Sequence, residues 1–238
     1  MYFLIGGGEI RNLETFKVDA AIVEQSEKKN PNFLFIPTAS HDSEGYVKVV
    51  KSIYKDKLKC EYDFLSLSEK PDKTQIQNKI DKADIISVGG GDTKYLMDKW
   101  KEYNLDEILL NYKDDKILTG LSAGSICWFE KGISDTASFE INNGKWQYSL
   151  IDGLGFLPGI HSPHLDERER EAQYNEFTSK RDVSFIGIEN NCALVINEDE
   201  YWILRSNKNK NAYIVNVING VIKKEMIPNK GKIKEIFK

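Results

Sequence analysis

Short apolar runs that end in small residues constrain the fold of this 238-residue chain more than any other feature. These runs are Tyr2–Ile5 before three glycines, Asn32–Ile36 before Pro-Thr-Ala-Ser, Ala83–Val88 before three glycines, and Lys116–Leu121 before Ser122, with a weaker run at Tyr62–Leu67. Charged segments of helix length separate them, at about Leu13–Lys29, Glu44–Lys57, Lys73–Asp81, Thr93–Trp100 and Leu105–Lys113. Strands that alternate with helices predict an α/β fold, with a mostly parallel twisted sheet covered by helices on both faces.

The pattern changes after about residue 130. Asp166–Ser179 is strongly charged and is predicted to be a helix. Four strand-like runs then follow, at Phe185–Ile188, Ala193–Ile196, Tyr201–Leu204 and Ala212–Val217. We expect them to form antiparallel edge strands or a small extra sheet. Because no linker, repeat or low-complexity segment interrupts the chain, residues 1–238 are expected to form a single domain.

The composition of the chain limits the classes of partner that we expect it to bind. Hydrophobic residues make up 40% and charged residues 29% of the chain, and the net charge is −4. A mildly acidic chain offers no basic surface for nucleic acid or for an anionic membrane. Its three cysteines are widely spaced and form no CxxC pair, and no HExxH or clustered ligand set predicts a metal. We expect a cytoplasmic monomer or homodimer without a cofactor, since neither a signal peptide nor an apolar run of membrane-spanning length is present.

The segment Gly120-Leu-Ser-Ala-Gly124 is the strongest candidate for a reactive site. It follows a strand-like run and precedes an apolar stretch of helix length, which is the context of a nucleophile elbow. Such a tight turn needs small neighbours and presents the serine hydroxyl at its tip. Ser122 is therefore the candidate nucleophile, and the amide of Ala123 is a candidate oxyanion donor. The alternative is an ordinary strand-to-helix turn.

A nucleophilic serine needs a base, and the chain has three histidines: His41, His161 and His164. His164 is favoured because it nearly abuts the predicted charged helix, which would hold its imidazole rigidly over a cleft. A base in turn needs an acid to orient it. Residue type and position suggest Asp135, Glu189 and Asp166, and the residues alone do not rank them.

The segment Val88-Gly-Gly-Gly-Asp-Thr93 also ends a strand before a helix. It matches neither of the common glycine-rich phosphate motifs, so nucleotide binding has little support. The amides of Gly90 or Gly91 are candidate oxyanion donors, and a tight turn capped by Asp92 or Thr93 is the alternative. Gly6-Gly7-Gly8 is open to the same interpretations.

Four motifs in order resemble peptidase family S51, the serine peptidases that include peptidase E and cyanophycinase. The motifs are Ile85–Thr93, Gly120–Cys127, Ser162-Pro-His164 and Ile186–Asn190. The resemblance covers most of the chain. It implies a class I glutamine amidotransferase-like, flavodoxin-like α/β fold in which serine stands where the amidotransferases have cysteine.

The resemblance implies Ser122 as nucleophile and His164 as base. Asp135 resembles an aspartate that peptidase E carries in a loop after the elbow helix. The family also has a glutamate after the strand that Phe185–Ile188 resembles. That position is Asn190 in this chain, and Glu189 lies one position earlier. Asp135 and Glu189 are therefore joint candidates for the orienting acid.

The resulting expectation is a serine peptidase that cleaves dipeptides or short peptides. Aspartyl specificity would fit the resemblance, and Arg168, Arg170 and Arg181 are candidate contacts for an acidic substrate side chain. Two alternatives stay open at this point. One is an esterase of the α/β-hydrolase type, in which the histidine follows the acid in the chain, as it would in the order Ser122, Asp135, His164. The other is a non-catalytic protein on the same fold that binds a small molecule.

Overall fold

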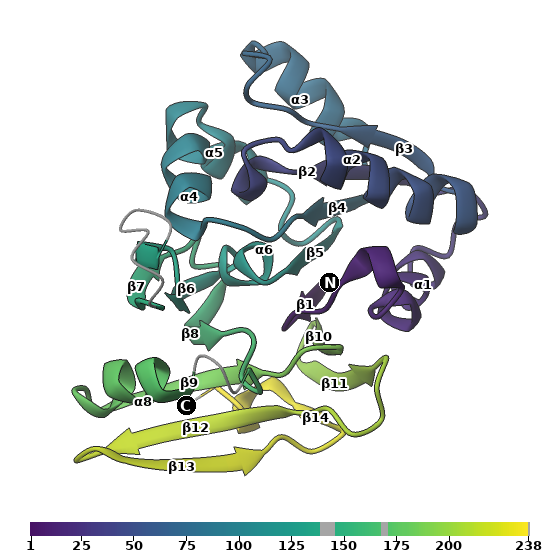
Figure 1. Cartoon of the computed structure of the whole chain (residues 1–238). Helices are drawn as coiled ribbons and strands as arrows, with labels where there is room; N and C mark the ends of the chain where they lie inside the picture. The colour runs from purple at the N-terminus through teal and green to yellow at the C-terminus, as the bar shows by residue number, and fades with distance from the viewer. Residues whose placement is uncertain (139–145, 168–170, 238) are drawn as a thin grey trace.

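The computed structural model describes residues 1–138, 146–167 and 171–237, and the strands of these segments form two sheets (Figure 1). The larger sheet has eight strands in the order β14-β11-β10-β1-β5-β4-β2-β3. They are β1 (Tyr2–Ile5), β2 (Asn32–Ile36), β3 (Glu61–Phe64), β4 (Ile85–Val88), β5 (Ile117–Leu121), β10 (Cys192–Asn197), β11 (Glu200–Arg205) and β14 (Lys230–Lys232). The first five strands of the chain pair in parallel, and the last three join them by antiparallel pairing.

Helices cover both faces of this sheet, as the alternation of strands and helices predicts. One face packs against α1 (Phe16–Glu24), α2 (Glu44–Lys51) and η3 (Ser52–Lys57), and the other packs against α3 (Lys73–Lys82), α4 (Thr93–Glu102) and α5 (Leu105–Leu110). Successive residues of a strand point to opposite faces of the sheet. In β1, Phe3 and Ile5 pack on the face covered by α1 and α2, and Leu4 packs on the face covered by α3, α4 and α5. The described residues also include the short 3₁₀ turns η1 (Ile10–Asn12), η2 (Thr38–Ser40) and η5 (Ile233–Glu235).

The second sheet has six strands in the order β13-β12-β9-β8-β6-β7. They are β6 (Phe129–Ser134), β7 (Ser149–Asp152), β8 (Leu157–Ser162), β9 (Val183–Ile188), β12 (Ala212–Ile218) and β13 (Val221–Met226). Helix α8 (Glu171–Ser179) packs on it through Tyr174 and Phe177, against a small core that includes Phe185 and Val215. In Figure 1 this sheet reaches the lower edge of the molecule at β12 and β13.

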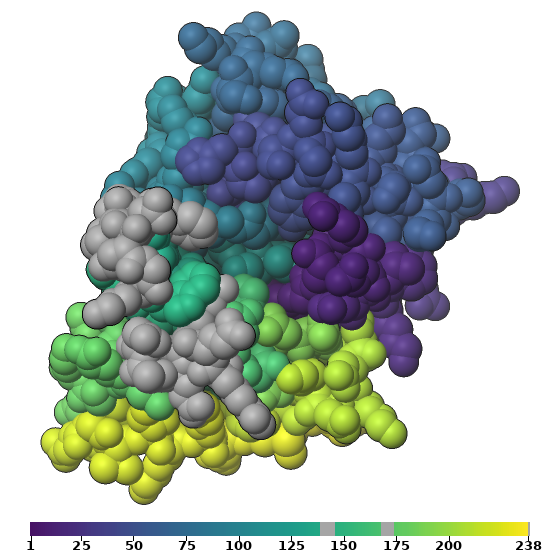
Figure 2. Space-filling model, in the orientation of Figure 1, coloured from purple at the N-terminus to yellow at the C-terminus, as the bar shows by residue number. Residues whose placement is uncertain are grey.

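In the described residues the chain passes between the two sheets four times: from β5 to β6, from β9 to β10, from β11 to β12 and from β13 to β14. The first two crossings lie at the site described below. Helix α6 (Ala123–Ile126) connects β5 of the large sheet to β6 of the second sheet, and residues 189–191 connect β9 back to β10. Because β10 then pairs with β1, the beginning of the chain lies against its second half. The space-filling view shows this contact between purple and green segments (Figure 2).

Both arrangements expected for the C-terminal strands occur, since β10, β11 and β14 extend the large sheet while β9, β12 and β13 build the second one. The predicted helix Asp166–Ser179 differs from the structure at its start. His164 has φ 54°, and the amide of Glu167 donates to the carbonyl of His164 at 3.1 Å, so residues 164–167 form a turn and α8 begins at Glu171. Within the described residues, every helix is too short or too polar to cross a bilayer.

Candidate active site

Ser122 lies on a strained turn between β5 and α6. Its backbone has φ 57° and ψ −116°, a combination that side-chain-bearing residues adopt rarely and that nucleophile elbows require. The amide of Ser122 donates to the carbonyl of Ile5 at 3.0 Å, which ties the turn to β1. A Cβ at Gly120 would overlap the carbonyl of Gly124, and a Cβ at Gly124 would overlap the carbonyl of Val88. The two glycines of the motif are therefore steric requirements of the turn.

The imidazole of His164 lies against this serine. Its Nε2 is 2.8 Å from Ser122 Oγ, although 42 residues separate the two in the chain. The backbone of His164 is also fixed, because its amide donates to the carbonyl of Gly6 at 3.0 Å. The structure thus brings together the nucleophile and the base that the sequence predicted.

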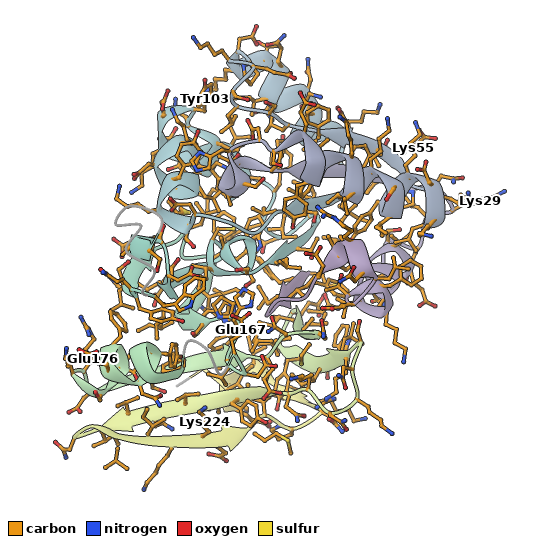
Figure 3. All side chains as sticks on the ribbon, viewed as in Figure 1. Lys29, Lys55, Tyr103, Glu167, Glu176 and Lys224 are labelled. Carbon is orange, nitrogen blue, oxygen red and sulfur yellow. The ribbon has the colours of Figure 1, made fainter. Side chains whose placement is uncertain are left out.

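The other side of the imidazole faces two oxygen acceptors. His164 Nδ1 is 2.7 Å from Asn190 Oδ1 and 2.7 Å from Glu167 Oε1. The side chains of His164 and Glu167 are partly buried, with exposed fractions of 19% and 27%. Figure 3 shows Glu167 near the middle of the molecule, between its upper and lower parts.

Gly7 allows the imidazole to take this position. A Cβ at this residue would overlap Asn190 Oδ1 and stand 2.5 Å from His164 Nδ1. Its φ of 157° is likewise suited to glycine. Gly7 therefore serves the close packing of the site.

The two joint candidates for the orienting acid, Asp135 and Glu189, lie elsewhere. Glu189 Oε2 accepts a hydrogen bond from the amide of Asn211 at 2.8 Å, and burial raises the pKa of its carboxyl group. Asp135 follows β6, and its neighbours bond to the start of α4: Ser134 Oγ lies 2.8 Å from Thr93 Oγ1. In the described part of the chain, neither carboxylate contacts the His164 ring, whose side-chain partners are Ser122, Asn190 and Glu167.

The three predicted oxyanion donors surround Ser122. Gly90 is so close that a Cβ there would stand 3.3 Å from Ser122 Cβ. Its amide donates a long hydrogen bond of 3.4 Å to Tyr46 Oη. Gly90, Gly91, Ser122 and His164 line one cavity of about 350 Å³. Ala123 is the first residue of α6, where the helix supplies no carbonyl for its amide.

His161 belongs to the core. It is fully buried, and its ring lies between Ser125 Oγ at 2.8 Å and the carbonyl of Ile186 at 3.0 Å. Burial lowers its pKa to about 4. Because a carbonyl oxygen only accepts hydrogen bonds, Nδ1 carries the proton and donates to Ile186. The single hydroxyl proton of Ser125 then faces two acceptors, His161 Nε2 and the carbonyl of Ser122 at 2.7 Å. His161 thus supports the elbow from behind.

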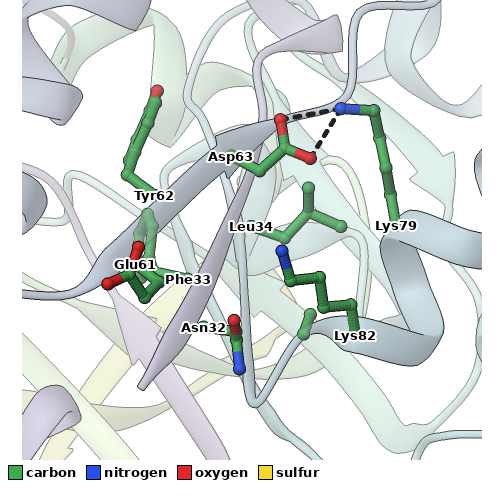
Figure 4. Close-up of a pocket in the computed structure, with 9 residues that line it drawn as sticks. Asn32, Phe33, Leu34, Glu61, Tyr62, Asp63, Lys79 and Lys82 are labelled. Carbon is green, nitrogen blue, oxygen red and sulfur yellow. Dashed lines mark hydrogen bonds and ion pairs between the residues drawn. The ribbon is translucent and has the colours of Figure 1, made fainter. Parts of the chain in front are cut away.

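A smaller cavity, of about 60 Å³, lies at the opposite ends of the strands. Asn32 begins β2 and Glu61 begins β3, and Figure 4 shows Lys79 paired with Asp63 beside them. Ligands of open parallel sheets bind at the carboxyl ends, where Ser122 lies, so this cavity is not the candidate site. Across the described residues, no group of three or more His, Cys, Asp or Glu side chains could hold a metal ion.

Comparison with known proteins identifies the family. Residues 2–204 match the model of peptidase family S51. This chain belongs to peptidase family S51. An uncharacterized peptidase of Bacillus subtilis (strain 168), YgaJ, is 35% identical over 178 residues, which cover 74% of this chain and 73% of the relative. Family membership makes the chain a peptidase and leaves the α/β-hydrolase esterase without support.

Two solved structures share the fold of this S51 peptidase. A peptidase from an acI-B1 Actinobacterium superimposes with a TM-score of 0.66 at 21% identity, covering 97% of this chain and 96% of the other. A candidate peptidase E protein from Listeria monocytogenes EGD-e has a TM-score of 0.64 at 20% identity, covering 86% and 97%. At these identities the likeness concerns the fold alone.

Sequence reasoning missed Glu167 in this S51 peptidase. The residue was assigned to a charged helix, whereas it lies in the turn that follows His164. A usable signal was its spacing of three residues from the histidine, which a turn converts into contact. Of the three arginines proposed for an acidic substrate, Arg168 and Arg170 lie outside the described residues. Arg181 bonds to the carbonyl of Phe177 at 2.7 Å, at the end of α8.

Proposed function

We propose that this S51 peptidase is a serine peptidase that hydrolyses dipeptides or short peptides, with Ser122 as nucleophile and His164 as general base. One observation carries the proposal: the 2.8 Å contact between Ser122 Oγ and His164 Nε2 at a strained elbow. The partners of Nδ1 are acceptors, so Nδ1 holds the proton and Nε2 presents its lone pair to the hydroxyl. This is the tautomer that a general base needs.

The reaction then follows from these positions. Ser122 Oγ attacks the scissile carbonyl carbon while its proton moves to His164 Nε2, and the carbonyl electrons move onto oxygen. When the C–N bond breaks, Nε2 returns the proton to the leaving amine. Water attacks the acyl-enzyme by the same route, and His164 again accepts and returns the proton.

The oxyanion needs donors that are in place before the reaction. In this proposal the amides of Gly90, Gly91 and Ala123 supply them. Support comes from the shared cavity of the two glycines with Ser122 and from the position of Ala123 at the start of α6. The positive end of this short helix adds to the same effect.

Short peptides fit the cavity because it carries exposed charges of both signs. Glu9 and Arg11 line it together with Ser122. A carboxylate and a guanidinium beside the nucleophile suit the free amino and carboxyl ends of a small peptide. We therefore expect blocked peptides to be cleaved more slowly than free ones.

A dipeptide library tests the proposal directly. Wild-type protein and Ser122→Ala are compared on free dipeptides and on their acetylated and amidated forms. The variant should lose at least about 10³-fold in rate, the scale seen when a triad member is removed. A fluorophosphonate probe should label the wild type at Ser122 and leave the variant unlabelled. Unchanged hydrolysis by Ser122→Ala would contradict the proposal, and a wild type that neither cleaves nor labels would instead favour the binding protein considered above.

A further inference from the structure

We propose that Glu167 is the positioning carboxylate of His164, and that Asn190 holds it in place through its side-chain amide. This inference rests on the proposed serine-peptidase function and names the acid that the sequence left open. It assigns a role to a residue that lies in the turn after the histidine, rather than to a residue at the family's expected position.

His164 Nδ1, Glu167 and Asn190 contact one another in a triangle. Glu167 Oε1 and Asn190 Oδ1 are both 2.7 Å from Nδ1, and Asn190 Nδ2 donates to Glu167 Oε1 at 3.2 Å. Asn190 thus accepts from the imidazole with its oxygen and donates to the carboxylate with its nitrogen. All three distances are consistent with one orientation of the amide, which leaves the Nδ1 proton shared between two acceptors.

The local backbone explains why Glu167 reaches the ring. His164 has a left-handed φ of 54°, and the amide of Glu167 donates to the carbonyl of His164 at 3.1 Å. The amide of Leu165 donates to the carbonyl of Ile188 at 3.2 Å, which anchors the turn to β9. A turn with these bonds places the side chains of residues three apart on the same side, so Glu167 faces His164.

Asn190 is itself fixed by an ion pair behind it. The amide of Asn190 donates to Asp166 Oδ1 at 2.8 Å, and the other oxygen of Asp166 pairs with Lys210. The side chain of Asp166 is 13% exposed, so this support is mostly shielded from water. The two acidic residues of the turn therefore have separate tasks: Asp166 holds the backbone of Asn190, and Glu167 faces the imidazole.

The two acceptors on Nδ1 differ in charge, and only the charged one can stabilise a protonated imidazole. Asn190 stands where the S51 resemblance expects a glutamate, and its neutral amide can orient the ring but cannot balance an imidazolium. When Ser122 transfers its proton to Nε2, the ring becomes positive, and a carboxylate 2.7 Å away lowers the energy of that state. Glu167 thus supplies the negative charge that position 190 lacks.

The test measures fluorophosphonate labelling of Ser122 by intact-protein mass spectrometry across pH. Glu167→Gln should label roughly 10²- to 10⁴-fold more slowly at pH 7.5, the range that general-base catalysis contributes. The midpoint of the rate against pH should also move to lower pH, because an imidazolium without its counter-charge loses its proton more easily. Glu176→Gln, the same change at an exposed position on α8, is the matched control and should behave as wild type.

A second variant separates charge from shape. Adding Asn190→Glu to Glu167→Gln returns a carboxylate to the imidazole from the neighbouring position. This double variant should regain part of the labelling rate and move the pH midpoint back upward.

A Glu167→Gln protein with the wild-type rate, or one with a lower rate but an unmoved midpoint, would overturn the inference. Failure of the proposed function gives a different result, because the wild type itself would then remain unlabelled at every pH.

Discussion

At the scale of single residues, Gly7 shows how little space the site leaves. The imidazole of His164 and the amide of Asn190 both lie against its Cα, where any other residue would place a Cβ. No flexible side-chain end can yield there, since both neighbours are held by hydrogen bonds of 2.7 to 2.8 Å. The contact between His164 and Ser122 therefore depends on the absence of a Cβ at Gly7.

Replacing Gly7 by alanine should reduce activity strongly while the protein still folds. The new Cβ would push the imidazole away from Ser122, and small displacements of catalytic groups cost about 10²-fold in rate. Gly45→Ala is the control, because the nearest atom to its Cβ would be 3.8 Å away, on Ser43. Labelling rates and circular dichroism of both variants check the prediction, which equal labelling rates would refute.

The same residues show what could be predicted from the sequence. The structure brings Ser122 and His164 into contact, as predicted. This prediction was possible because a nucleophile elbow is a local motif, and its strand and helix can be recognised from apolar runs in the sequence. The spacing of three residues between His164 and Glu167 was a usable signal, but their contact also depends on a left-handed φ at His164, which the apolar runs do not predict. The run of charges from Asp166 suggested a helix and concealed the turn.

At the scale of single elements, α1 carries a buried carboxylate that the proposed mechanism does not use. Asp19 is 2% exposed, and it accepts hydrogen bonds from Thr15 Oγ1 at 2.9 Å and Tyr54 Oη at 2.8 Å. Burial outweighs these two bonds and raises the pKa of Asp19 to about 6. The packing of α1 on the sheet should therefore respond to pH.

Asp19→Asn tests this response. An unfolded aspartate has a pKa of about 3.9, so between about pH 4 and pH 6 the unfolded chain releases a proton that the folded chain keeps. Wild-type stability should fall as pH rises through this window, by about 2 to 3 kcal/mol in total, and change no further above it. The variant lacks this loss, so its free energy of unfolding relative to wild type should increase from pH 4 to pH 7.

Urea unfolding of both proteins at several pH values measures the difference. Asp56→Asn, at an exposed position on η3 close to Tyr54, is the control for the loss of one carboxylate. A difference between Asp19→Asn and wild type that stays constant from pH 4 to pH 7 would contradict the raised pKa of Asp19.

At the scale of the whole molecule, the site lies where the chain crosses between its two sheets. Ser122 precedes α6, which leads from the large sheet to the second one, and Asn190 lies on the way back from β9 to β10. His164 follows β8 of the second sheet. The contact between Ser122 and His164 thus depends on how the two sheets are held together.

The strands after residue 204, beyond the match to the family model, contribute to this assembly. Strand β12 pairs with β9 of the second sheet, and β14 pairs with β11 of the large sheet. The last segment of the chain therefore adds two strands, β12 and β13, to the second sheet and one strand, β14, to the large sheet. We expect it to be required for stability, although it supplies no residue that contacts Ser122 or His164 in the described part of the chain.

Val215→Ala tests the contribution of β12. Val215 is fully buried opposite Phe185 of β9, and its replacement should lower the free energy of unfolding by about 2 kcal/mol, from lost burial and the cavity left behind. Ile218→Ala on the same strand is the control, because Ile218 is 59% exposed and its truncation should change stability little. Urea unfolding measures both variants, and equal effects would mean that β12 is not part of the folded core.

Labelling of Ser122 should remain near wild type in Val215→Ala under native conditions, since β9 keeps its pairing and the turn at His164 keeps its bonds.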